Sequence, residues 1–246
     1  RYIDGTRISY YNNNVNKIVG RNYIINSDQK ESWFEDDELS IRINRLINSN
    51  EIAFYFYDGF WKSPSGFDIV SNRYIFPKLS VYGASIRSSL FSFIVNSEIG
   101  YYDSKEDKNG DDQFINNSEI RFLVGVEREI FSEITASMQY YLEKMKDYDN
   151  YYINLQNQLT AKDKLRELVT LRLTQFLMNQ NLKLSLFNFF SPTDKDHYTR
   201  INIDYKYSDL INFGMGVNLF AGKENYSFFS QFQDNSNGYI YLRYGF

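Results

Sequence analysis

Charged side chains that alternate with apolar ones are the residues of this sequence best placed to do chemistry. Arg172 stands between Leu171 and Leu173, and Arg243 stands between Leu242 and Tyr244. A period of two sends successive side chains to opposite faces of a strand, so these charges share a face away from the apolar residues. The residues that the same parity places on this polar face are Glu119, Arg121, Arg172, Arg200, Asp204, Lys206 and Arg243.

Charges of both signs on one face can line a path for water and solutes, or can pair across strands and fill the interior. On the opposite, lipid-facing side an Arg or Lys costs about 2–4 kcal/mol near the bilayer midplane. We therefore predict that these seven residues line a pore. Filling of the interior by the same charges remains the alternative.

Catalysis is the weaker interpretation, because the sequence offers a single histidine, His197. A hydrolase of the Ser-His or Asp-His type would need this residue as its general base. It lies in a polar segment, and the triplet Ser-Asn-Gly at 236–238 lies far along the chain and is typical of a turn. We predict no catalytic residue and no enzymatic activity.

The segment 103–112 is rich in carboxylates, which are among the oxygen ligands that Ca²⁺ prefers. A register that puts Gly110 sixth in an EF-hand loop puts Lys105 first, where an acidic ligand belongs. We interpret this segment as a solvated loop and expect neither a metal site nor a cofactor.

The composition combines many aromatic residues with a polar average. Phe, Trp and Tyr make up 18% of the 246 residues, yet the mean hydropathy is −0.50. A membrane barrel produces this combination, because alternate side chains meet lipid and water and aromatic girdles lie at both interfaces. The sequence has no cysteine, which excludes disulfides, and its net charge of −4 gives no reason to expect nucleic acid binding.

Alternation is clearest in six segments that we predict to be strands: 119–127, 134–142, 169–174, 200–207, 211–219 and 239–246. Short turns are expected near 48–50, 88–90, 128–131, 178–181 and 207–210. Longer polar loops are expected near 26–37, 59–77, 103–115, 144–164, 191–196 and 221–236, with a short helix at 155–168. This alternation of short and long connections is typical of an all-β, antiparallel up-and-down transmembrane barrel, of which we expect 12–14 strands.

The predicted strands form one domain, a single transmembrane β-barrel over residues 1–246, although residues 1–37 are weakly patterned. Counting back from the last residue gives about 13 strands, whereas a complete single-chain bacterial barrel has an even number. The chain also begins at Arg1, without an initiator Met or a signal peptide. We therefore expect the C-terminal part of a longer barrel.

Two resemblances support this interpretation. The last eight residues resemble the terminal strand of outer-membrane proteins, which implies that Tyr244 and Phe246 are an assembly signal for the barrel-assembly machinery. The segments 59–64, 81–85, 100–107, 171–175, 190–194 and 228–235 together resemble an uncharacterised porin-like outer-membrane β-barrel family of Gram-negative bacteria. The wider resemblance implies a bacterial outer-membrane location, and the chain is similar to the C-terminal portion of that family.

The sequence therefore predicts a porin-like channel for passive diffusion of small hydrophilic solutes. A structural, partner-binding or lipid-binding barrel without an open pore is the alternative. The expected partners are outer-membrane lipid, the barrel-assembly machinery, and either a second copy of the chain or another envelope protein, with no nucleic acid and no cofactor.

Overall fold

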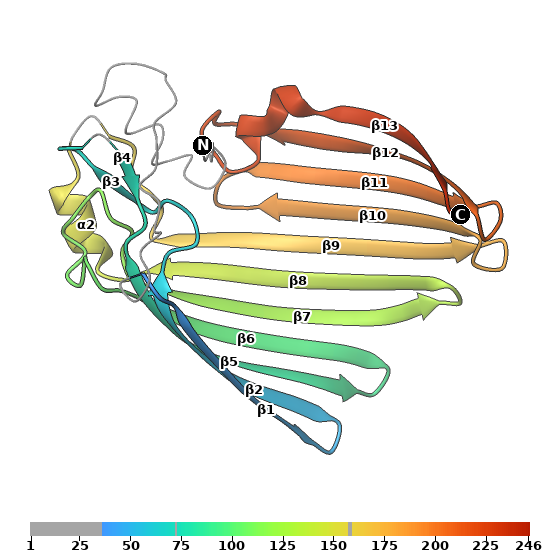
Figure 1. Cartoon of the computed structure of the whole chain (residues 1–246), viewed down its shortest axis with the longest axis horizontal. Coiled ribbons are helices and arrows are strands. Elements are labelled where there is room, and N and C mark those ends of the chain that lie inside the picture. The colour runs from blue at the N-terminus through green and yellow to red at the C-terminus, as the bar shows by residue number, and fades with distance from the viewer. Residues whose placement is uncertain (1–35, 72, 157–158) are drawn as a thin grey trace. The chain divides into compact units, whose positions relative to one another are not determined.

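The computed structural model describes residues 36–71, 73–156 and 159–246, and these contain thirteen strands (Figure 1). The strands are β1 (Leu39–Ile47), β2 (Asn50–Phe60), β3 (Gly66–Asp68), β4 (Arg73–Ile75), β5 (Lys78–Leu90), β6 (Phe93–Ser104), β7 (Glu119–Phe131), β8 (Ile134–Met145), β9 (Leu165–Leu177), β10 (Leu182–Ser191), β11 (Asp196–Lys206), β12 (Ile211–Gly222) and β13 (Asn237–Tyr244). One α-helix, α2 (Tyr148–Asn154), and one 3₁₀ helix, η1 (Ser230–Asn235), lie in connections. The weakly patterned residues 1–35 lie outside the described part.

Eleven strands form one sheet in the order β1-β2-β5-β6-β7-β8-β9-β10-β11-β12-β13. Neighbours in the chain are thus neighbours in the sheet, apart from the separate β3–β4 hairpin between β2 and β5. The predicted all-β, antiparallel, up-and-down class and the count of 12–14 strands are confirmed at this level, although the main sheet holds eleven of the thirteen strands.

The short turns differ from the prediction at two places. The expected turns at 88–90 and 128–131 belong to β5 and β7, and the chain reverses two or three residues later, at 91–92 and 132–133. Phe91 and Glu133 adopt φ angles of 55° and 65° there, without the glycine that usually marks such a turn. The connection 192–195, expected as a long loop, has only four residues.

The predicted helix at 155–168 is wrong. The α2 helix covers Tyr148–Asn154, and residues 165–168 are already part of β9. β9 must present backbone groups to its neighbours over its whole length, so sheet pairing overrides the helical spacing of the leucines in this segment.

The described chain divides into two compact units. Among the described residues, unit 1 comprises those of 36–86, 98–122 and 142–166, and unit 2 comprises 87–97, 123–141 and 167–246. The prediction of a single domain over 1–246 remains a prediction.

Much of the buried apolar core of unit 1 lies between its strands of the main sheet, in the segments that connect them. The ring of Phe67 in β3 packs edge-on against Tyr74 in β4, with centroids 5.6 Å apart, and contacts Phe114 from the 105–118 connection. Tyr151 of α2 is buried, and its hydroxyl accepts a hydrogen bond from the backbone N–H of Lys162. These contacts fix the long connections of unit 1 against one another.

Unit 2 instead exposes an apolar face. Register pairs Ile203 with Met215, and Met215 with Ile240, so these side chains lie on one face of β11–β13. They are 37%, 49% and 82% exposed. We call this surface the apolar face of unit 2. Among the described residues, no helix is both long and apolar enough to cross a membrane.

Candidate functional site

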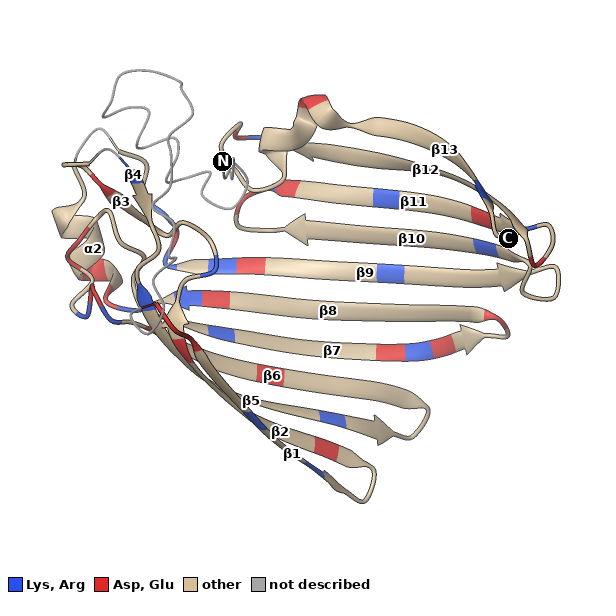
Figure 2. Ribbon diagram, in the orientation of Figure 1, with Lys and Arg blue, Asp and Glu red and all other residues tan. Residues whose placement is uncertain are grey.

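The face of unit 2 opposite its apolar face carries most of the predicted site residues. Register places Arg172 beside Phe187, and Phe187 beside Arg200. It also places Lys206 beside Asn212, and Asn212 beside Arg243. Directly paired residues point to the same side of a sheet. The members of this polar face of unit 2 that parity predicted are Arg172, Arg200, Asp204, Lys206 and Arg243, and Figure 2 shows their positive members on β9, β11 and β13.

Two tyrosines of β13 organise the centre of this polar face. The hydroxyl of Tyr239 donates to Asn202 Oδ1 at 2.7 Å, and the hydroxyl of Tyr241 donates to Asp204. Arg200 donates to the Tyr239 hydroxyl at 3.3 Å and to Asn202 Oδ1 at 3.2 Å. The network holds the guanidinium of Arg200 in place, and the Arg200 side chain remains exposed.

Glycines on β12 allow the two tyrosine side chains of β13 to extend across β12 to β11. Register pairs Gly214 with Tyr241 and Gly216 with Tyr239. A Cβ on Gly214 would lie 2.2 Å from Cζ of Tyr241, and a Cβ on Gly216 would lie 2.7 Å from Cζ of Tyr239. The rings therefore lie flat over the glycines and bring their hydroxyls to β11, in the manner of aromatic side chains that cover glycines in sheets.

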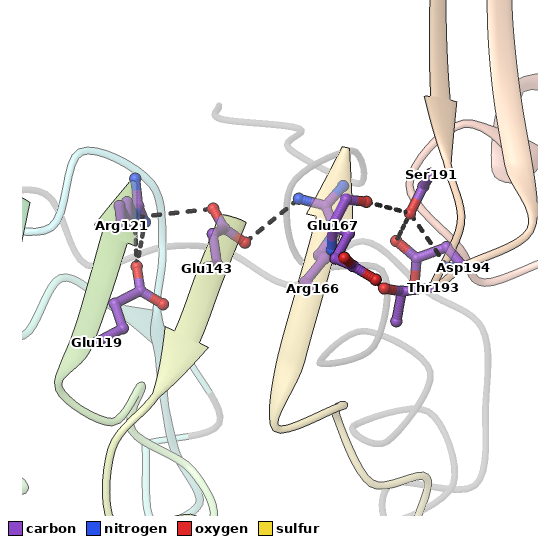
Figure 3. Close-up of polar contacts among 8 residues, drawn as sticks. All are labelled: Glu119, Arg121, Glu143, Arg166, Glu167, Ser191, Thr193 and Asp194. Carbon is purple, nitrogen blue, oxygen red and sulfur yellow. Dashed lines mark hydrogen bonds and ion pairs between the residues drawn. The ribbon is translucent and has the colours of Figure 1, made fainter. Parts of the chain in front are cut away.

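The remaining two predicted residues, Glu119 and Arg121, lie in unit 1 as members of a chain of ion pairs (Figure 3). Arg121 Nε donates to Glu119 Oε1 at 2.6 Å and lies 3.7 Å from Glu143 Oε1. Arg166 completes the chain at 3.3 Å from the other oxygen of Glu143. These four side chains are 18–30% exposed, so the pairs are only partly screened by water.

Aromatic and lysine side chains surround this ion-pair chain within unit 1. The guanidinium of Arg121 lies 4.0 Å from the ring centroid of Tyr102 and 5.9 Å from that of Trp61. The Lys162 ammonium, from the connection before β9, donates to Asn116 Oδ1. Burial lowers the pKa of Lys162, and the nearby charges of Glu119 and Glu143 oppose that effect. The arrangement is a fixed, nearly neutral array rather than an isolated charge.

Four charged residues of these arrays were missed by the sequence reasoning. Lys183 lies on the polar face of unit 2, because register pairs it with Asp204. The alternation of Leu182, Leu184 and Leu186 with Lys183 and Ser185 was a signal that could have found it. Glu143 continues the polar parity of β8. Lys162 and Arg166 fell within the segment predicted to be helical.

The other candidates lie apart from both arrays. His197 pairs with Phe190 and Ala221, on the face opposite to the polar face of unit 2. Asp107, in the carboxylate-rich loop, is buried, and its Oδ1 accepts the backbone N–H of Asp111 at 3.0 Å. In the part of the chain that the structure describes, no group of three or more His, Cys, Asp or Glu residues could hold a metal ion.

The predicted assembly signal lies at the end of β13. Tyr244 pairs with Ile211, and Phe246 follows the strand with its side chain fully exposed. Its role in assembly remains a prediction.

An antiparallel meander with one polar and one exposed apolar face is the pattern of the porin-like fold class. The outer-membrane channel DcaP of Acinetobacter baumannii matches the chain with a TM-score of 0.50 at 13% identity, over 84% of this chain and 62% of that chain. A mutant of the Rh. blastica porin gives a TM-score of 0.48 at 13% identity, over 86% and 56%. The calcium-bound phospholipase OMPLA of Salmonella typhi gives 0.37 at 8% identity, over 85% and 77%.

The chain therefore has a porin-like fold. It spans 62% of the length of the DcaP channel and 56% of that of the Rh. blastica porin. No family model and no curated protein matches it.

Proposed function

We propose that this chain forms part of an outer-membrane β-barrel channel through which small hydrophilic solutes diffuse passively. The observation that carries the proposal is the opposition of two faces within unit 2. One is apolar and exposed, and the other carries arginines, tyrosines and asparagines joined by hydrogen bonds.

The apolar face supports a lipid environment. On this face Phe213 pairs with Leu242, and these side chains are 45% and 64% exposed. A continuous exposed apolar surface is unfavourable in water at about 25 cal/mol per Å². Contact with the hydrocarbon of a bilayer removes this cost, as on the outer surface of a membrane barrel.

The polar face supports an aqueous interior. An arginine in contact with lipid costs about 2–4 kcal/mol near the midplane, so Arg172 and Arg200 require water or a polar partner. Both side chains are exposed, and Arg200 keeps this exposure despite its bonds to Tyr239 and Asn202. The charges of this face therefore suit the lining of a solute path, together with Asp204, Lys206 and Arg243.

The alternative is a structural, partner-binding or lipid-binding barrel without an open pore. The cross-strand bonds of Tyr239 and Tyr241 favour it, since such bonds also fill the interiors of small barrels. Catalysis is not part of either proposal.

The proposal includes the membership and partners that the sequence suggested. We assign the chain to the uncharacterised porin-like family of Gram-negative bacteria, with Tyr244 and Phe246 as signals for the barrel-assembly machinery. We propose that lipid surrounds the barrel and that a second copy of the chain or another envelope protein binds it.

Planar-bilayer recording of the natural full-length protein tests the channel directly. We expect stepwise conductance that scales with salt concentration, and swelling of liposomes in small sugars. A protein that is folded by circular dichroism, yet gives neither conductance nor swelling, contradicts the channel and favours the closed barrel.

A further inference from the structure

The connection between β12 and β13, residues 223–236, is folded onto the polar face of unit 2. The ring of Phe229 is only 6% exposed and lies 5.6 Å from Phe189 and 6.1 Å from Tyr198, centroid to centroid. Register pairs Phe189 with Tyr198, and Tyr198 with Phe220, on the same face as Arg200. Phe232 of η1 packs on Phe220 at 5.6 Å. The connection therefore covers the end of the polar face that lies beyond Arg200.

A buried carboxylate at the first residue of β11 fixes this connection. Asp196 has 0% exposure, and its Oδ2 accepts the Ser227 hydroxyl at 2.8 Å and the Phe229 backbone N–H at 2.7 Å. Hydrogen bonds to an ionised acceptor are roughly twice as strong as neutral ones. In the described residues Oδ1 of Asp196 is buried without a hydrogen-bond partner, so both bonds on this carboxylate go to the connection.

A glycine allows the close approach. Gly222 ends β12 opposite Asp196. A Cβ at Gly222 would lie 2.5 Å from Cβ of Asp196 and 2.7 Å from Cβ of Ser230. A larger residue at position 222 would require β11 or the start of η1 to shift, so the missing side chain permits their close approach.

We propose that Asp196 is a positioning residue that holds residues 223–236 on the polar face as a cover, and that this cover narrows the solute path beside Arg200. The proposal rests on the proposed channel function and adds the segment that sets its aperture. The physical basis is the pairing of one desolvated carboxylate with two donors of the cover, supported by the packing of Phe229 and Phe232.

A thiol reporter tests the anchoring without any recording of current. None of these 246 residues is a cysteine, so Ser230→Cys introduces the one thiol of this part of the protein, at a position that is 5% exposed, and any cysteine elsewhere in the full-length protein is replaced by serine in every variant. In the full-length protein, we expect Asp196→Ala to raise the labelling rate of this thiol by about tenfold or more, because loss of bonds to a charged acceptor raises the population of the detached cover. Ser227→Ala removes one of the two bonds and leaves the sequence of β11 intact, so it should give a smaller rise.

Asp234→Ala is the matched control, because it removes the same charge from an exposed position of the same segment. It should leave the labelling rate unchanged. An unchanged rate in both Asp196→Ala and Ser227→Ala, in folded protein, overturns the anchoring role of Asp196.

Conductance tests the position of the cover. We expect Asp196→Ala, and not Asp234→Ala, to increase single-channel conductance. Faster labelling with unaltered conductance in a conducting protein overturns the narrowing of the path. Absence of conductance in the parent protein contradicts the channel itself, and the labelling rates still decide whether Asp196 holds the cover.

Discussion

At the scale of single residues, the polar face of unit 2 depends on glycines as much as on charges. Gly214 lets the ring of Tyr241 cross β12 so that its hydroxyl reaches Asp204. A Cβ added to Gly238, in contrast, would have no neighbouring atom closer than 3.6 Å. We predict that Gly214→Ala destabilises the protein by about 1–3 kcal/mol through overpacking and loss of the Tyr241 bond.

Gly238→Ala is the matched control for Gly214→Ala and should change stability little. Unfolding in denaturant, followed by tryptophan fluorescence in detergent micelles, measures both. Equal stability of the two variants would show that the Tyr241 ring moves aside without cost.

Two loop carboxylates should titrate on opposite sides of their usual range. Burial raises the pKa of Asp107. The hydrogen bond and the charge of Lys206, whose Nζ lies 2.6 Å from Asp209 Oδ1, lower the pKa of Asp209. For Asp107 the folded pKa lies above the unfolded one, so its contribution favours folding at acidic pH and is lost as the pH rises through the folded pKa. For Asp209 the contribution is present above the unfolded pKa and is lost as the pH falls through the folded one.

Carbon NMR of labelled aspartate carboxyls measures this order. Lys206→Gln should move the Asp209 transition upward and leave that of Asp107 in place. Titration of Asp209 above Asp107 in the parent protein contradicts both assignments.

At the scale of elements, period-two patterning predicted the strands far better than their ends. The alternation predicted for 211–219 and 239–246 agrees with β12 and β13, where register pairs apolar residues with each other directly, as with Met215 and Ile240. The turn at 91–92 was missed because Phe91 carries none of the usual turn chemistry, although it is 95% exposed. The strand simply continues through Ser88 and Ser89, which look like turn residues in isolation.

Some charged residues of the ion-pair chain were missed for the same reason. Arg166 pairs with Glu143 only because β9 begins at Leu165, and the sequence around it carries leucines at helical spacing. The pairing of strands in the sheet decides which residues of neighbouring strands lie side by side. The pattern of a single sequence therefore does not predict the pairing of charges in the ion-pair chain. The tie between Asp196 and Ser227 is likewise tertiary, joining residues 31 apart.

Spin labels along β12 test the assignment of its two faces. Labels at 213 and 215 should respond to oxygen in lipid, and labels at 212 and 218 to a water-soluble relaxation agent, because Asn212 and Asn218 pair with Arg243 and Arg200 across the polar face. Position 214 is avoided, since a side chain there meets Tyr241. Absence of alternation would contradict a strand with one face in lipid.

At the scale of the whole molecule, net charge and local charge differ in sign. The chain carries a net charge of −4, yet the unit 2 part of β9–β13 gathers five cations against two carboxylates on its polar face. The cations are Arg172, Lys183, Arg200, Lys206 and Arg243, and the carboxylates are Asp196 and Asp204. One carboxylate is buried, and the other accepts a bond from Tyr241. The net charge of this face is therefore positive, and in the proposed channel we expect it to favour anions.

Reversing two of these charges tests whether the face lies on the permeation path. Arg172→Glu with Arg200→Glu changes the face by four charges and leaves it net negative, so the reversal potential in a salt gradient should move toward cation preference. Arginine keeps its charge at any relevant pH, so the parent preference should not titrate through these groups. Lys195→Glu, at an exposed position in the connection 192–195, is the control for a charge change outside the strands and should shift the reversal potential much less. An unchanged reversal potential in a folded, conducting double variant would place Arg172 and Arg200 away from the solute path, and with them the face on which the proposed channel depends.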